Sequence, residues 1–253
     1  MKLAALAAIW LSIAGCATPQ VRLYWRVRDL ALASAPAIEL QTSGGKSVLI
    51  IKPQTVNKLL LAHLRITRSA GVQAELVIVE EERPNAFVGL VSGRRVIAIN
   101  TAMIQLIGDD IDEFAALLCH ETAHWAKGHV DAGTLRSKTI EGMGALIGSG
   151  LGMAGIPAAG LITGIGGELI AASFSRDDER EADATSVDYM IFNGFDPTAA
   201  LRLQETMQAL PGGLSLPFLN SHPSGAERVD NFKKLIEAKM SQPHATAERP
   251  EER

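Results

Sequence analysis

Two histidines and a glutamate within five residues are the part of this sequence whose spacing points most directly to chemistry. They form the segment His120-Glu121-Thr122-Ala123-His124. Residues four apart lie on one face of a helix, so both imidazoles can reach a single metal ion. Glu121 lies between them in angle and can reach a water beside that ion without being a ligand. The pattern predicts a metal site that activates water for hydrolysis.

The residues around this pair distinguish a metal site from a solvated histidine face. Most of them are apolar and indicate a largely buried helix: Phe114, Leu117, Leu118, Cys119 and Trp125. Two imidazoles and a carboxylate inside such a helix need polar partners, and a metal ion supplies them. We therefore favour metal binding over a solvated face.

A third ligand is expected from a second cluster of charged residues, at positions 175–183. Glu179 and Asp183 are four residues apart and share one face of a predicted helix. One carboxylate can bind the metal while the other accepts a hydrogen bond from a ligand imidazole and so fixes the orientation of that ring. Taken alone, the cluster is only a helix start whose acidic residues complement the helix dipole.

Length and composition limit the kind of protein that carries this site. The chain has 253 residues, of which 47% are hydrophobic and 21% charged, and its formal net charge is -4. These values suit one large domain or two small ones with an apolar core, and they exclude a disordered charged polymer. No basic stripe indicates nucleic-acid binding. The only cysteines are Cys16 and Cys119, so no disulfide framework supports the fold.

The elements that position these residues follow from periodicity and from capping residues. Apolar residues at helical spacing, with Pro53 in the first turn, predict a helix over 53–68. Asp110 opens the helix of the histidine pair and Gly128 closes it. Further helices are expected over 21–33, 177–193, 196–210 and 224–240, and strands over 72–80, 86–91 and 96–100. No strand is expected after residue 100, and the order of elements predicts an α+β fold that is mainly helical, with a small antiparallel sheet.

The first residues have the pattern of an export signal. Lys2 precedes an uncharged apolar run that ends at Gly15, which predicts a signal peptide over 1–15. The end of this run resembles a bacterial lipobox, so we expect Cys16 to be lipidated and to tether the protein to the membrane. Ala17 after the cysteine favours the outer membrane, with the protein facing the periplasm. The alternative is an uncleaved anchor helix.

The rest of the chain divides into a tether, a domain and a tail. Residues 16–52 are interpreted as an N-terminal tether with irregular or helical structure, 53–241 as the domain of the metal site, and 242–253 as a disordered tail. Within the domain, 142–167 is uncharged and contains ten glycines. That composition makes a poor continuous helix, so it favours a mobile helical hairpin or lid over a membrane span. A segment that lies along the membrane surface is the alternative.

Several motifs together resemble the HtpX-like family of zinc metallopeptidases. They are His-Glu-Thr-Ala-His at 120–124, Glu-Arg-Glu-Ala-Asp at 179–183, Asn-Ala-Phe at 85–87, Gly-His at 128–129, Gly-Phe-Asp-Pro at 194–197, and His222-Pro223 with Arg228. The resemblance covers about 54–232, and the length and lipobox are similar to those of its small lipoprotein members. It implies a zincin-like metalloprotease domain that holds one Zn²⁺ ion per chain.

The resemblance also implies roles for individual residues. Glu121 corresponds to the catalytic base, and Asp183 to the outer partner of a ligand imidazole. His222 corresponds to a histidine that some relatives bring over the metal as a latch or as a transition-state helper. Glu181 is a rival third ligand, but it points to another face of its helix. The zinc ligands implied by the family are His120, His124 and Glu179.

Together these features predict a membrane-tethered zinc endopeptidase that hydrolyses unfolded or misassembled envelope proteins, with outer-membrane assembly proteins as candidate partners. An extended substrate is expected to pair with the strand at 96–100 or with its hairpin partner. One alternative is an envelope chaperone or scaffold whose zinc site is closed by His222 and seldom cleaves. A structural metal site in a membrane-binding module is a weaker alternative, because Glu121 has no role in it.

Overall fold

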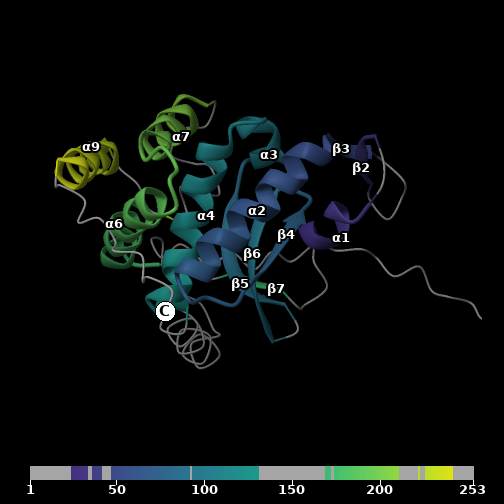
Figure 1. Ribbon diagram of the computed structural model, residues 1–253, viewed down its shortest axis with the longest axis horizontal. Helices are drawn as coiled ribbons and strands as arrows, with labels where there is room; N and C mark the ends of the chain where they lie inside the picture. Colours follow the sequence, from purple (N-terminus) through teal and green to yellow (C-terminus); the bar gives the residue numbers. More distant parts are fainter. Residues whose placement is uncertain are drawn as a thin grey trace, which may run out of the picture.

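The helix that carries the histidine pair lies at the centre of the fold. The computed structural model describes residues 24–33, 36–41, 47–91, 93–130, 169–171, 174–210, 222 and 226–241. Helix α4 (Ile111–Ala126) lies between α2 (Pro53–Ser69) on one side and α6 (Arg176–Phe192) and α7 (Thr198–Ala209) on the other (Figure 1). The predicted signal peptide, Cys16, the glycine-rich segment 142–167 and the tail 242–253 lie outside the described residues.

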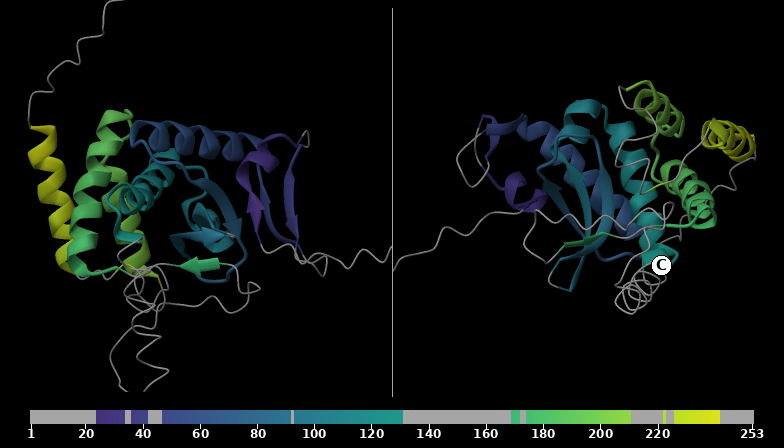
Figure 2. Two further views of the ribbon diagram at one scale, coloured as in Figure 1. Left: turned by 90° about the horizontal axis from the view of Figure 1, so that it is seen from below. Right: turned by 180° about the vertical axis from the view of Figure 1, so that it is seen from behind.

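The remaining elements surround this helical centre. α9 packs against α6 and α7 at one end of the molecule, and the hairpin of β2 and β3 lies at the other end (Figure 2). Among the described helices, none is both long and apolar enough to cross a bilayer. The other bounds are α1 Val27–Ala31, α3 Thr101–Ile107, α9 Ala226–Met240, β1 Trp25–Arg26, β2 Ile38–Gln41, β3 Ser47–Ile51, β4 Glu75–Val79, β5 Ala86–Val91, β6 Arg94–Asn100 and β7 Leu169–Ala171.

A mixed sheet supports the helices from one side. Its five strands have the order β1-β4-β6-β5-β7, and only the pair of β4 and β6 is parallel. One face of these strands joins the main core beneath the helices, and the other face forms a second, smaller apolar cluster. Both faces are therefore buried, which is why these strands are apolar at nearly every position.

The structure confirms the α+β class and the long helices, and it differs from the predictions in the short elements. Strand β7 contradicts the expectation that no strand follows residue 100. β2 and β3 lie in the segment that was expected to be irregular or helical, and the helix expected over 21–33 is the two-residue β1 followed by the five-residue α1. Runs of two to five residues are too short to show a periodicity, and their pairing partners are distant in sequence.

The prediction that an extended substrate pairs with the strand at 96–100 is wrong, because this strand is part of β6 in the interior of the sheet. β6 lies between β4 and β5, and both of its edges are hydrogen-bonded within the sheet. Its hairpin partner β5 is also covered on its outer edge by β7, from Gly89 to Val91. An extended chain cannot add to a strand whose backbone groups are already paired.

Helix α4 places the histidine pair inside the core. The Asp110 side chain accepts hydrogen bonds from the backbone N–H groups of Asp112 and Glu113, which caps the first turn. Every residue from Phe114 to Trp125 is buried. The two imidazoles are thus fixed by packing on all sides of their helix, as the apolar neighbours predicted.

A buried histidine on α2 is expected to make the fold acid-sensitive. His63 lies within hydrogen-bond distance of the Ala74 carbonyl oxygen, 3.1 Å from its Nε2, and burial lowers its pKa to about 4. Unfolding restores a pKa of about 6.5. The stabilisation is therefore complete above pH 6.5 and is lost as the pH falls towards 4, by about 3 kcal/mol. Urea unfolding at pH 7, 5.5 and 4 should show a smaller acid loss for His63→Gln than for the unmodified chain, and parallel losses would contradict this assignment.

Candidate metal centre

Four donor atoms from three segments of the chain converge beside α4. His120 and His124 come from α4, Glu179 from the first turn of α6, and His222 from the segment before α9; all four side chains are buried, and their donor atoms lie within 4.8 Å of one another. The two Nε2 atoms of the α4 histidines are 3.1 Å apart. The Glu179 carboxylate oxygens lie 3.4 Å from His120 Nε2 and 3.3 Å from His124 Nε2.

These spacings fit a tetrahedral zinc ion. Zinc binds imidazole nitrogen and carboxylate oxygen at about 2.0–2.2 Å, which places the corners of its tetrahedron about 3.3 Å apart. His222 Nδ1 lies at a similar distance from two of these donors, 3.2 Å from His120 Nε2 and 2.9 Å from Glu179 Oε1, so it is available as a fourth donor. The residues present therefore suit a zinc ion held by three expected ligands and closed by His222.

The outer contacts of His120 explain why a cation belongs here. Asp183 Oδ1 lies 3.0 Å from His120 Nδ1 and accepts its N–H, which turns the Nε2 lone pair inwards. Asp183 is itself held by Arg228, whose Nε and Nη2 donate to its two oxygens at 2.8 and 2.6 Å. Lone pairs and a carboxylate that face one another in a buried site repel unless a cation lies between them.

The pKa shifts in the cluster follow from burial and from the neighbouring charges. Burial lowers the pKa of His124 well below its ordinary value, which leaves this imidazole neutral and able to bind a metal. Burial and Arg228 act in the same direction on His120, but Asp183 and Glu179 outweigh them and raise its pKa to about 9. Without a metal ion His120 is therefore protonated at neutral pH, and a zinc ion would take the place of the proton on Nε2. Burial alone would raise the pKa of Glu179; the histidines around it hold that pKa well below its usual range, so this carboxylate is ionised.

Glu121 has the surroundings of a proton-transfer group. Its side chain is fully buried, and neither carboxylate oxygen has a hydrogen-bond partner among the described residues. Oε1 lies 3.4 Å from His222 Nε2, beside the metal cluster and outside the set of four donors. Burial raises the pKa of Glu121 above that of an ordinary glutamate, which makes the carboxylate a better proton acceptor.

Comparison with known proteins matches residues 53–236 to the model of peptidase family M48. The chain belongs to this family. The match covers the histidine pair of α4, Glu179 and His222, and it agrees with the resemblance to HtpX-like metallopeptidases.

Individual M48 relatives are similar at modest identity. The chain is 28% identical over 183 residues to the mitochondrial metalloendopeptidase OMA1 of Schizosaccharomyces pombe, which covers 72% of this chain and 52% of OMA1. It is 25% identical over 142 residues to the metalloprotease LoiP of Escherichia coli, covering 56% of each chain. A protease HtpX homologue of Leptothrix cholodnii is 27% identical over 232 residues, with 78% of each chain covered. The chain thus spans about half the length of OMA1 and LoiP.

Two residues of the M48 site were not predicted from the sequence. His129 lies with its Nδ1 3.1 Å from His124 Nδ1, while its Nε2 is 3.3 Å from Glu181 Oε2. Phe174 stacks on the His124 ring, with 3.6 Å between the ring centroids. His129 thus holds the outer nitrogen of His124 as Asp183 holds that of His120. The feature of the sequence that could have indicated the position of His129 is Gly128 directly before it. In the structure Gly128 has a φ of 73°, which turns the chain back towards the helix.

Other candidate residues do not belong to the set of four donor residues. Glu181 is excluded from the donor set, because its carboxylate contacts Lys127 and His129 on the exposed side of α6. Cys119 is buried beside His120, and burial raises its thiol pKa well above the usual value, so it stays protonated. His63 lies on α2 at the Ala74 carbonyl. His244, Pro223 and Ser224 lie outside the described residues.

Proposed function

We propose that this M48 protein is a zinc-dependent endopeptidase. The observation that supports it best is the combination of a buried His120, His124 and Glu179 donor set with the Glu121 carboxylate beside it. A purely structural zinc site, even one closed by four donors, has no use for a buried carboxylate that none of the described residues hydrogen-bonds. The relatives OMA1 and LoiP are named a metalloendopeptidase and a metalloprotease, which agrees with this proposal.

The roles of the residues follow from their positions. A bound zinc ion acts as a Lewis acid towards a peptide carbonyl and makes water more acidic. Glu121 accepts a proton from the attacking water and returns it to the leaving amine, which its raised pKa favours. Asp183 and His129 hold the outer nitrogens of the two ligand imidazoles, so both Nε2 atoms stay directed at the ion. Arg228 neutralises the surplus negative charge of Asp183 and Glu179.

A self-latched chaperone or scaffold is the second candidate function, and the position of His222 is the observation that favours it. His222 is fully buried and lies where a substrate carbonyl or water would have to bind. In this arrangement the site is closed, and cleavage requires His222 to move away. The two functions differ in how often that movement occurs.

We further propose that the protein is tethered to the bacterial outer membrane through a lipidated Cys16 and cleaves unfolded or misassembled envelope proteins. The support for the tether is the lipobox-like sequence that ends at Cys16. The support for unfolded substrates is the burial of the site, since a folded protein cannot place a peptide bond beside a residue as deep as Glu121. Outer-membrane assembly proteins are the proposed partners.

Metal removal tests the proposed peptidase activity. The purified full chain should contain about one zinc ion per molecule by elemental analysis, and it should degrade denatured casein. Dialysis against a strong chelator should abolish the cleavage, and one equivalent of zinc should restore it. A chain that holds no stoichiometric metal, or one that cleaves casein equally well after chelation, would rule out this function.

A further inference from the structure

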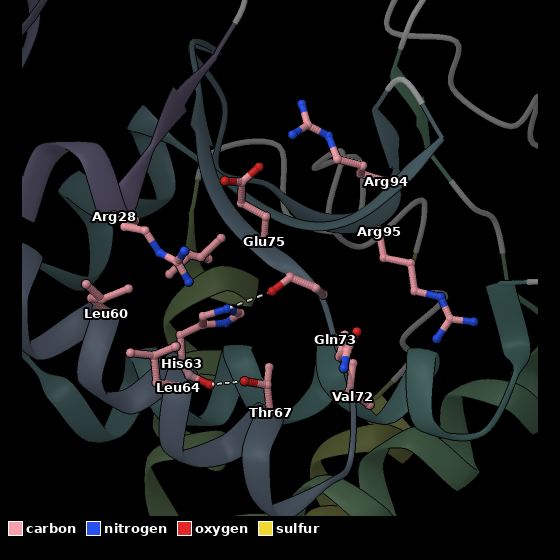
Figure 3. A pocket seen from close by; sticks show the side chains of 12 residues that line it. Arg28, Leu60, His63, Leu64, Thr67, Val72, Gln73, Glu75, Arg94 and Arg95 are labelled. Carbon is pink, nitrogen blue, oxygen red and sulfur yellow. Dashed lines mark hydrogen bonds between the residues drawn. The ribbon is translucent and has the colours of Figure 1, made fainter.

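A pocket of about 510 Å³ lies beside helix α2, and the proposed hydrolysis does not use it. Figure 3 shows His63 and Thr67 of α2 on one side of the pocket, with Glu75 of β4 and the arginines of β6 across from them. Arg28 of α1 closes the near end, beside the His63 ring. Pockets of a few hundred Å³ accommodate small ligands or a few residues of an extended peptide.

The charge of this pocket is positive. Arg28, Arg94 and Arg95 line it, and none of the three pairs with a carboxylate among the described residues. Glu75 is the only acidic side chain in the lining, and it lies 3.8 Å from Arg26 outside the pocket. Guanidinium groups that have no acidic partner of their own are free to bind a carboxylate of another molecule.

The floor of the pocket is apolar. Val72 and Leu76 are buried beneath the pocket, so its exposed apolar surface comes from Leu60, which is partly buried, and from Leu64, whose side chain is 42% exposed to solvent. His63 adds a buried polar atom, because its Nδ1 has no hydrogen-bond partner among the described residues. A free inorganic anion would leave the leucines uncovered, whereas a peptide that carries both apolar and acidic side chains satisfies the floor and the arginines together.

The pocket adjoins the metal centre through Trp125. The Arg95 guanidinium lies over the Trp125 ring, 4.8 Å from its centroid, and the Trp125 indole N–H donates to the Val96 carbonyl. Trp125 directly follows the proposed ligand His124 on α4. Arg95 thus links the pocket lining to the helix that carries the histidine pair.

We propose that this pocket binds an acidic, leucine-rich segment of a protein substrate and so selects substrates outside the metal centre. The proposal rests on the proposed peptidase function, since it names the class of chain that the enzyme prefers. Electrostatic complementarity at such a secondary site gives selectivity and faster association more than it gives tight binding.

Binding to a zinc-loaded Glu121→Gln protein tests the pocket without requiring hydrolysis. Fluorescence anisotropy compares a labelled peptide of alternating leucine and glutamate with a twin in which glutamine replaces glutamate. We expect the acidic peptide to bind about tenfold more tightly than its twin, and the added substitutions Arg28→Gln and Arg94→Gln to remove that preference. Arg176→Gln, which removes an exposed arginine at the start of α6, is the matched control and should keep it.

Three outcomes would overturn the proposal. The first is equal binding of the two peptides, and the second is a preference that survives the two pocket substitutions. The third is competition by phosphatidylglycerol vesicles. If these vesicles displace the acidic peptide from the unsubstituted protein but not from the variant with both arginines replaced, the pocket binds a lipid headgroup. Because the binding assay uses a protein that does not cleave, it tests the pocket independently of the casein assay, which tests the peptidase activity.

Discussion

Casein hydrolysis is expected to fall about a thousandfold or more when Glu121 is replaced by glutamine, while the zinc content stays at one ion per chain. Glutamine keeps the volume of the buried side chain but cannot accept a proton from water. The four donor atoms of the cluster do not include Glu121, so the substitution leaves them in place. Elemental analysis and a fluorescent casein assay on the same sample measure both quantities.

His124→Ala is the control that separates loss of the base from loss of the metal. His124 supplies one donor at the centre of the cluster, so its removal should abolish zinc binding and hydrolysis together. The role of Glu121 as base would be wrong if Glu121→Gln retained ordinary turnover. It would also be wrong if both variants lost their zinc to the same extent.

Replacing His222 by alanine is expected to raise the rate of casein cleavage about tenfold and to weaken zinc binding. In the proposed closed state, His222 Nδ1 lies beside His120 Nε2 and Glu179 Oε1 and would have to move before a substrate enters. Its removal therefore destabilises the closed state and takes away one donor at the same time. Cleavage rates measured at saturating zinc, together with chelator competition, report the two effects separately.

The double variant Glu121→Gln with His222→Ala shows whether the extra cleavage comes from this site. It should be as inactive as Glu121→Gln alone, because opening the site does not replace the base. A fall in activity for His222→Ala at saturating zinc would instead identify His222 as a group that assists the reaction. In that case the closed arrangement would not limit turnover.

The long helices and the residues of the metal cluster could be predicted from the sequence. The spacing of His120 and His124 requires a helix, and Asp110 and Gly128 mark where it begins and ends. The charged cluster at 175–183 forms the start of α6 and brings Glu179 and Asp183 to the histidine pair. The pattern within each segment is local, because the residues that encode it lie within one or two helical turns. The meeting of Glu179 with the histidine pair is not local, and it was expected only because the pair needs a third ligand and because the motifs resemble a known family.

The features that the sequence did not reveal depend on contacts between distant segments. The pairing of β7 with β5 joins Leu169 to Val91, and neither strand shows in its own residues which partner it will take. The contact of His129 with His124 depends on how Gly128 turns the chain, and the stacking of Phe174 depends on the approach of α6. Periodicity describes one segment at a time and does not specify such contacts.

The separation of the donor residues along the chain has a consequence for how the protein responds to a shortage of zinc. His120, Glu179 and His222 are supplied by α4, by α6 and by the segment before α9, so an ion bound by all three would tie the middle of the sequence to its C-terminal part. Any ion that binds only the native state adds its binding free energy to folding. A shortage of zinc in the surrounding medium would therefore lower the amount of this enzyme through unfolding and degradation. It would also leave the remaining molecules inactive.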